Sequence, residues 1–168
     1  MRGMAESQDL TFRQMMGRFA TGVAVVLTAG RNGPVGLTVN SLTSLSLDPP
    51  LLLFCAKNSS RTAEAVLDCG LFSVNILAAA QTDVSSFFAG QRERWDITKC
   101  RGHGAWLAIP DCNGALLCKV ASVYPGGDHS IIVGEVKEIL APAAPQRPLL
   151  FHEGRYRLLP HQESALCR

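Results

Sequence analysis

Residues 36–62, GLTVNSLTSLSLDPPLLLFCAKNSSRT, carry the pattern that decides the fold. Their first part is rich in hydroxyl side chains. Asp48-Pro49-Pro50 then breaks the chain, because proline lacks a backbone donor and fixes φ. Residues 51–56 form a short apolar run, which is typical of a buried strand. The run leads into residues 57–62 (KNSSRT) and a helix-like segment. A loop of this composition at a helix N-terminus indicates an anion site, because free N–H groups and the helix dipole both attract negative charge.

The rest of the chain alternates short apolar segments with turns. We expect strands at residues 23–28, 36–39, 71–77, 114–124, 129–140 and 149–159, with hairpin or turn signals at Asn32-Gly33, Pro125-Gly126-Gly127-Asp128 and Glu153-Gly154. We expect helices at residues 10–20 (capped by Asp9, ended by Gly22), 60–67 (started by Ser60 or Thr62, ended by Cys69-Gly70) and 82–88 (capped by Thr82). Residues 91–105, which include Trp95, are expected to form a long surface loop, and residues 141–148 an irregular link.

Strands joined by tight turns, with few helices, favour an antiparallel barrel over a parallel β-α-β sheet. The length of 168 residues suits a single domain over residues 1–168. We place its core at about residues 10–159, from the positions of the outermost apolar segments. Hydrophobic residues make up 47% of the chain, which excludes a largely disordered protein.

Composition also limits the partners and the compartment. The net charge is only +2 and no basic block stands out, which argues against a nucleic-acid binder. No apolar stretch approaches the roughly 20 residues that cross a bilayer, and residues 1–10 lack the apolar core of a signal peptide. The six cysteines form no CxxC pair. We therefore expect reduced thiols in a cytoplasmic protein that binds no membrane.

Three kinds of ligand-binding motif are incomplete or absent in the sequence. Cys100, His103 and Cys112 match no standard zinc spacing, so we expect no metal site. The glycine-rich residues 30–33 are not a P-loop, because no Gly-Lys-Ser/Thr follows them. No GxGxxG follows a strand, so a nicotinamide nucleotide would not sit on a Rossmann unit.

Six motifs occur together over residues 10–158: FRQMMGRFATGVAVV, the stretch quoted above, FSVNIL, FAG, GDHSIIVGEV and FHEGRYRLL. In this order they resemble the flavin reductase family with the FMN-binding split-barrel fold, the small reductase components of two-component flavin-dependent monooxygenases. The resemblance implies a mainly β protein, an antiparallel split barrel of Greek-key type with a few short peripheral helices. It also implies a homodimer that reduces FMN or FAD with NADH, or NADPH, and supplies reduced flavin to a separate monooxygenase.

The resemblance also assigns site residues. It implies that the flavin is bound by residues in four segments: Thr38, Val39, Asn40 and Ser41; Cys55 and Ala56; Lys57, Asn58, Ser59, Ser60 and Thr62; and Phe87 and Ala89. It places His129 beside the flavin as the catalytic residue, where the nicotinamide stacks, and Tyr156 near the pyridine nucleotide or the dimer edge. The reaction would be hydride transfer from nicotinamide C4 to flavin N5.

The residues themselves leave plainer alternatives open. Thr38 and Ser41 could simply occupy strand positions, and residues 57–62 could form a solvated helix cap. A lone histidine such as His129 is more often structural, and Phe87 could pack in the core. For the whole protein, the alternative is a flavin-binding or electron-transfer module without reductase activity.

Overall fold

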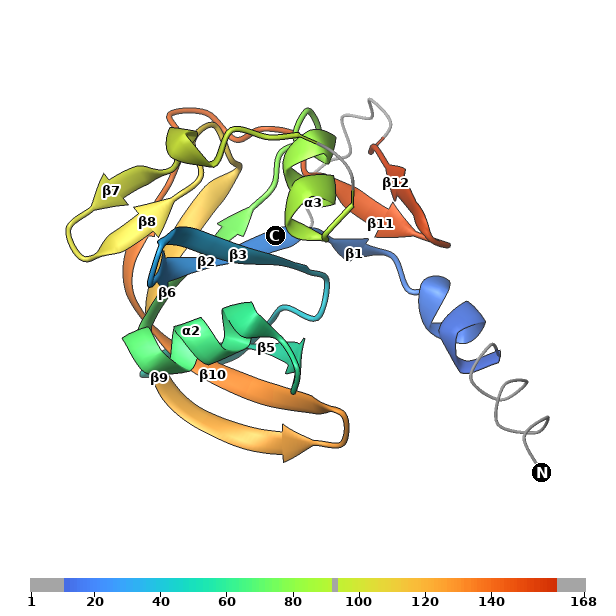
Figure 1. The fold of residues 1–168 in the computed structure, drawn as a ribbon. Coiled ribbons are helices and arrows are strands. Elements are labelled where there is room, and N and C mark those ends of the chain that lie inside the picture. Colours follow the sequence, from blue (N-terminus) through green and yellow to red (C-terminus); the bar gives the residue numbers. More distant parts are fainter. Residues whose placement is uncertain (1–10, 92–93, 160–168) are drawn as a thin grey trace.

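The computed structural model describes residues 11–91 and 94–159. Its main sheet has seven strands in the order β3-β2-β6-β9-β10-β5-β4, all paired antiparallel (Figure 1). The strands are β2 (Ala24–Gly30), β3 (Gly33–Val39), β4 (Thr43–Leu47), β5 (Pro50–Lys57), β6 (Leu71–Ile76), β9 (Gly114–Gly126) and β10 (His129–Leu140). The expected strands are confirmed, and most extend beyond the predicted limits.

The sheet curls into an open barrel. β3 and β4 lie at its opposite edges, although only residues 40–42 separate them in the chain. Four Cα-to-Cα steps reach at most about 14 Å, so the two edges must approach each other. They are not paired in the sheet order, and the barrel stays split between them. The predicted mainly β, antiparallel split barrel is confirmed.

β2 is buried on both faces and separates two apolar clusters. Val26 packs in the cluster inside the barrel, where the rings of Phe54 and Phe72 meet edge to face with centroids 5.4 Å apart. Val25 packs in the second cluster with Phe88. Burial on both faces explains why this strand is a continuous apolar run rather than an alternating one.

Two helices lie where the sequence predicts them. α2 (Arg61–Cys69) begins at the N-cap Ser60, whose Oγ accepts from the Ala63 N–H at 3.2 Å, and ends at Gly70 with φ 71°. α3 (Thr82–Phe88) follows β6, but its N-cap is Gln81 and no side chain caps it, so the capping role expected for Thr82 is wrong. Figure 1 shows α2 and α3 on opposite sides of the β2–β3 hairpin, and α2 contributes Ala63 and Val66 to the cluster inside the barrel.

The N-terminal helix is shorter than expected. Residues 11–17 are helical, and the chain then turns into β1 (Thr21–Gly22), which pairs with β11 (Leu150–His152). The expected continuation to residue 20 and stop at Gly22 are therefore wrong, because pairing with a strand from the end of the chain takes over. The cap at Asp9 and the helical position of Leu10 lie outside the described residues.

Turns between strands follow the local signals. The β2–β3 hairpin is confirmed, with Arg31 and Asn32 as the loop between paired Gly30 and Gly33. β11 and β12 (Arg155–Arg157) form the bent C-terminal hairpin, where Glu153 and Gly154 both have positive φ, 50° and 73°. The β9–β10 turn is tighter than predicted, because β9 extends to Gly126 and pairs there with His129.

The described part of residues 91–105 is not a plain surface loop. It contains a short helix, η1 (Ile97–Lys99), and β7 (Arg101–His103), which pairs with β8 (Trp106–Ala108). Trp95 packs against Phe87 and Phe88, with ring centroids 6.1 and 5.6 Å away. The expectation of a long loop is therefore wrong, because an aromatic residue within the polar sequence anchors the segment on α3. Residues 92–93 lie outside the described ranges.

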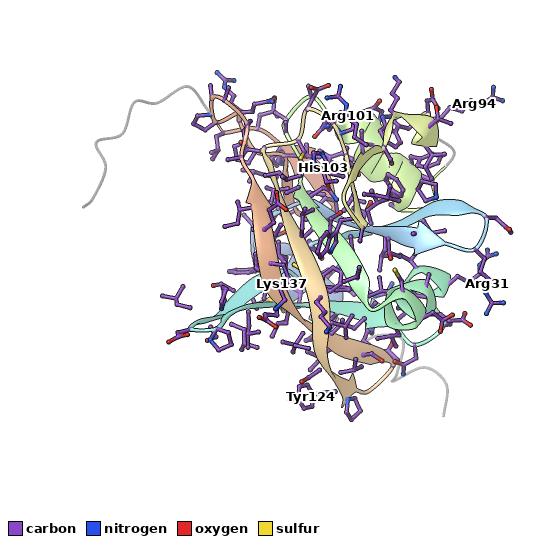
Figure 2. All side chains as sticks on the ribbon, turned by 90° about the vertical axis from the view of Figure 1, so that its left-hand side faces the viewer. Arg31, Arg94, Arg101, His103, Tyr124 and Lys137 are labelled. Atoms are coloured by element: carbon purple, nitrogen blue, oxygen red, sulfur yellow. The ribbon has the colours of Figure 1, made fainter. Side chains whose placement is uncertain are left out.

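Charged and metal-binding groups are dispersed. Figure 2 shows Arg31, Arg101 and Lys137 at separate places on the molecule. Over residues 11–91 and 94–159, no three His, Cys, Asp or Glu side chains gather as metal ligands would. Cys100 packs at the cluster under α3, whereas Cys112 belongs to another. The described helices include none of the length and hydropathy required to cross a membrane.

Candidate functional site

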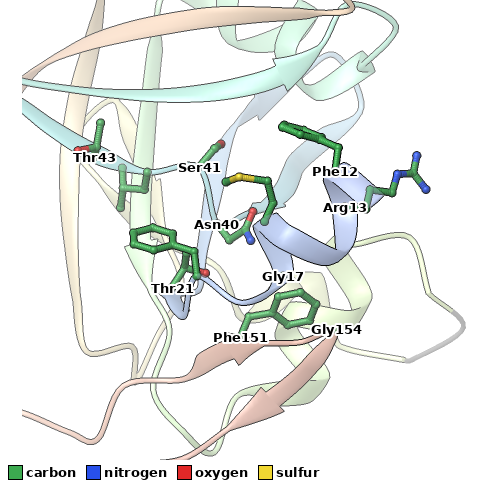
Figure 3. A pocket seen from close by; sticks show the side chains of 12 residues that line it. Phe12, Arg13, Gly17, Thr21, Asn40, Ser41, Thr43, Phe151 and Gly154 are labelled. Atoms are coloured by element: carbon green, nitrogen blue, oxygen red, sulfur yellow. The ribbon is translucent and has the colours of Figure 1, made fainter. Parts of the chain in front are cut away.

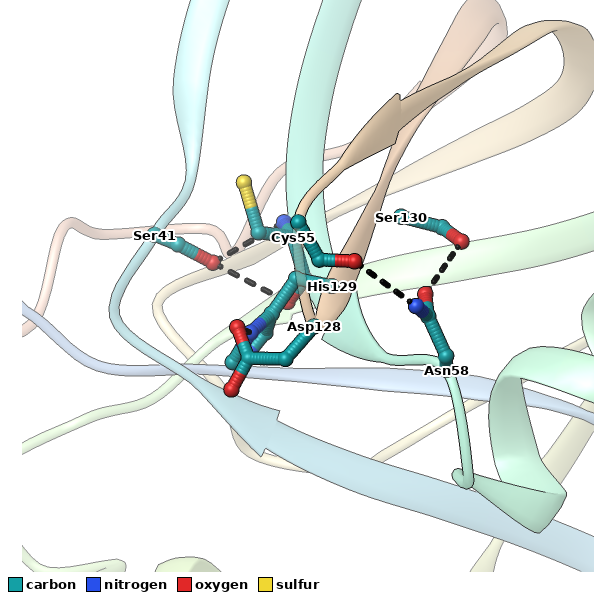
Figure 4. Close-up of polar contacts among 7 residues, drawn as sticks. Ser41, Cys55, Asn58, Asp128, His129 and Ser130 are labelled. Carbon is teal, nitrogen blue, oxygen red and sulfur yellow. Dashed lines mark hydrogen bonds and ion pairs between the residues drawn. The ribbon is translucent and has the colours of Figure 1, made fainter.

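The link between the two sheet edges is fastened to β5 by one side chain. Ser41 Oγ accepts from the backbone N–H of Cys55 at 3.0 Å and donates to its carbonyl oxygen at 3.2 Å (Figure 4). Backbone pairing between β4 and β5 ends at Thr43, which lies opposite Leu53. Beyond that point, the Ser41 hydroxyl takes the place of a backbone partner for Cys55. This bond brings predicted residues of two segments together at the open side of the barrel.

A pocket of about 190 Å³ lies on one side of this link. Five predicted residues line it: Thr38, Val39, Asn40, Ala89 and Tyr156. Their arrangement is fixed by the fully buried Ser85 on α3. Thr38 Oγ1 donates to its carbonyl oxygen at 2.7 Å, and the Tyr156 hydroxyl donates to its Oγ at 2.9 Å. Three segments that are distant in sequence are thereby held around one small space.

A larger pocket of about 530 Å³ opens on the other side of Asn40 (Figure 3). Asn40 and Ser41 face the N-terminal helix across it, and Phe12 and Phe151 add apolar walls. Thr21 also lines this pocket, and its Oγ1 is the one buried side-chain oxygen or nitrogen without a partner in the described part of the chain.

Residues 57–60 lead from the end of β5 into the N-terminus of α2. Lys57 and Ser59 are exposed, and Ser60 Oγ satisfies only the Ala63 N–H. The first N–H groups of a helix have no acceptor within the helix. Those of Arg61 and Thr62 therefore point outward at the positive end of the helix dipole. The loop therefore leads into a helix N-terminus as expected, and anion binding there stays a prediction.

The β9–β10 turn lies directly beside this loop. His129, the first residue of β10, is the cross-strand partner of Lys57. Its Nδ1 lies 2.7 Å from Asp128 Oδ1 (Figure 4). This hydrogen bond, followed by the charge of His129 and a smaller effect of Lys57, lowers the pKa of the Asp128 carboxyl. Asn58 bonds to the same turn, with Nδ2 donating to the Gly127 carbonyl oxygen at 3.0 Å.

Three predicted residues direct their side chains away from both pockets. The Phe87 ring packs against Phe88 at 5.0 Å between centroids, within the cluster under α3. Ala56 is 2% exposed and its methyl group lies in the barrel core, so only its backbone is available to a ligand. Thr62 Oγ1 donates to the Gly36 carbonyl oxygen at 3.0 Å and ties α2 to β3.

Several further residues of this region were not predicted from the sequence. Ser85 and Ser86 are buried on α3 near Tyr156, and Phe151 lines both pockets. The available signal for Ser85 and Ser86 was their place side by side on a short helix. The other inward-facing residues of this helix, Val84 and Phe88, are apolar. Phe151 carried no such signal, because its place depends on the pairing of β11 with β1.

Comparisons with known proteins agree with this arrangement. The model of the flavin reductase like domain matches residues 16–160. The flavin-dependent monooxygenase reductase subunit HsaB of Mycobacterium tuberculosis is 40% identical over 156 residues, which cover 90% of this chain and 83% of that protein. The NADH-dependent FMN reductase AsuE2 of Streptomyces nodosus subsp. asukaensis is 36% identical, over 88% of this chain and 83% of its own.

A solved structure shows the same fold. The NADH:FAD oxidoreductase SgcE6 of Streptomyces globisporus, in complex with NAD and FAD fragments, superposes with a TM-score of 0.85 at 30% identity. The superposition covers 94% of this chain and 96% of that one. With a family model that matches nearly the whole chain, and with the split barrel in place, the chain belongs to the flavin reductase like domain family.

Proposed function

We propose that this single-domain protein is an NADH-dependent flavin reductase that reduces FMN or FAD and supplies reduced flavin to a separate monooxygenase. The observation that carries the proposal is the continuous path from Tyr156 through Asn40 and Ser41 to Cys55, Lys57 and His129. These links connect the lining of the smaller pocket to the loop of residues 57–60 and to His129. The names of the relatives support the same activity.

The residues fit a flavin. Its ring system needs an apolar slot with hydrogen-bonding groups along one edge. Residues 38–41 and Phe151 line the two neighbouring pockets and would offer both. Its phosphate needs donors and positive charge, which Lys57, Ser59 and the α2 N-terminus offer. Cys55 and Ala56 lie between these two regions on β5.

The protein itself would contribute by holding the flavin and the nicotinamide nucleotide in contact. A bound flavin supplies the acceptor for the hydride that a reduced nicotinamide gives up. The loop of residues 38–41, held by Ser41 on β5 and by Thr38 on α3, keeps the slot rigid. His129 would orient the nicotinamide nucleotide or face negative charge on the reduced ring. Placement of two reactants in contact accounts for up to about 7–11 kcal/mol of a barrier in well-oriented reactions.

Further features support a homodimer. The described residues leave several large apolar side chains exposed on the edge strand β4 and on the β9–β10 surface: Leu45, Leu47, Val123, Tyr124 and Ile139. Tyr124 projects at the far end of the β9–β10 hairpin (Figure 2). A row of unpaired backbone groups next to exposed leucines favours association. We also propose a cytoplasmic location, where thiols such as those of the five described free cysteines stay reduced.

The test is NADH oxidation by the purified protein with FMN, FAD and riboflavin as acceptors. The proposal expects oxidation that depends on added flavin, with NADH preferred over NADPH. In His129→Ala, use of NADH should weaken more than flavin binding. A yellow protein that oxidises no NADH with any of the three acceptors would contradict the proposal and favour a flavin-binding module.

A further inference from the structure

Asn58 lies within the predicted phosphate loop, yet its polar groups are directed at the β9–β10 turn. Its backbone N–H donates to the Asp128 carbonyl oxygen at 3.0 Å, and Nδ2 donates to the Gly127 carbonyl oxygen at 3.0 Å. Its Oδ1 accepts from Ser130 Oγ at 2.9 Å (Figure 4). These three hydrogen bonds reach Gly127, Asp128 and Ser130, so they enclose His129 on both sides in the chain.

Asp128 adds a contact to the His129 ring itself. An ionised carboxylate only accepts hydrogen bonds, so at 2.7 Å the His129 Nδ1 must carry the proton. The carboxyl of Asp128, whose pKa this hydrogen bond lowers further, is ionised at neutral pH. Nε2 is then the ring nitrogen left for a ligand. The His129 side chain is 37% exposed and that of Asp128 is 89% exposed, so the turn itself does not fix the ring by burial.

We propose that Asn58 and Asp128 are positioning residues for His129: Asn58 holds the turn, and Asp128 holds the imidazole with Nε2 directed at the pyridine nucleotide. The inference rests on the proposed function, because it gives His129 a nicotinamide nucleotide to face. It reassigns Asn58 from the phosphate to the histidine. The charged Lys57 also faces this pair, across the β5–β10 ladder.

Asn58→Ala separates the two roles of this residue. The variant keeps the backbone bond to Asp128 and removes the two side-chain bonds, which at an exposed site correspond to about a two- to fivefold effect. We expect KM for NADH to rise by that factor while the flavin Kd, measured by fluorescence quenching, stays at the wild-type value. A weakened flavin Kd with an unchanged KM for NADH would make Asn58 a phosphate ligand and overturn the proposal.

Asp128→Ala tests the hold on the ring. Nitrogen-15 NMR of histidine-labelled protein without nucleotide should show that neutral His129 carries its proton on Nδ1. Asp128→Ala should lose this preference. Asp128→Asn should keep it, because the amide oxygen still accepts a hydrogen bond from Nδ1. KM for NADH should follow the same order, with about a two- to fivefold rise in Asp128→Ala. Glu138→Ala, an exposed carboxylate at the other end of β10, is the matched control and should change neither readout.

Two results would overturn the inference at different points. An unchanged tautomer in Asp128→Ala would show that the carboxylate does not set the ring. A changed tautomer with wild-type KM for NADH would show that the ring orientation does not serve the nucleotide. Because the NMR readout needs no NADH, it also separates these failures from a failure of the proposed function, which a wild-type protein that oxidises no NADH with added flavin would reveal.

Discussion

Ser41→Ala removes the hydroxyl that fastens the β3–β4 link to β5. The side chain makes two hydrogen bonds, at 3.0 Å from the Cys55 N–H and at 3.2 Å to its carbonyl oxygen, in a partly buried place. Each neutral bond contributes about 0.5–1.5 kcal/mol net, and both backbone groups lose their partner together. Because the site is partly exposed, water can replace part of the lost hydrogen bonding. We therefore expect a loss of about 1–2 kcal/mol in the free energy of unfolding.

The measurement is thermal and urea unfolding of the wild type, Ser41→Ala and Ser44→Ala. For a chain of this size the expected loss lowers Tm by about 2–8 °C. Ser44 is exposed on the neighbouring β4, so its variant controls for the loss of a hydroxyl from this region. We also expect weaker flavin binding in Ser41→Ala, because Asn40 loses its fixed position. If Ser41→Ala were as stable as Ser44→Ala, the hydroxyl would not close the barrel edge.

Three further predictions concern the core and the phosphate loop. In Gly134→Ala the new methyl group would lie 2.3 Å from Cζ of Phe72, which is 1% exposed, so we expect a loss of about 1–3 kcal/mol or more in urea unfolding; wild-type stability would show that this ring can move. Lys57→Ala with Ser60→Ala should loosen flavin, measured by fluorescence quenching, because a charge and the helix cap are lost; equal affinity would remove the loop from the site. Burial raises the pKa of Cys118 to about 12, so at pH 8 iodoacetamide should leave this thiol unmodified by mass spectrometry until the protein unfolds; rapid labelling of the native protein would contradict its burial.

Local signals were sufficient for much of the fold. Ser60 caps α2 and Gly70 ends it, because both roles depend on a few neighbouring residues. The β2–β3 hairpin and the positive φ at Glu153 and Gly154 likewise follow from short turn sequences. These elements could be predicted because their causes lie within a few positions of each other.

The errors have distant causes. The N-terminal helix ends early because Thr21 pairs with Phe151, and no local pattern reports that pairing. Trp95 orders its segment by packing on α3, which a polar sequence around it does not indicate. In the candidate site, the sequence predicted Asn58 as a flavin-binding residue of the phosphate loop, but only the three-dimensional structure shows that its amide is turned toward Gly127 and Ser130.

Anaerobic rapid mixing tests the central claim most directly. The purified protein, preloaded with FMN or FAD, is mixed with one equivalent of NADH while the absorbance of oxidised flavin and of NADH is followed together. The proposed activity predicts that both signals fall at the same rate, one flavin reduced for each NADH consumed, and far faster than without protein. Bound flavin that stays oxidised while NADH persists would contradict it.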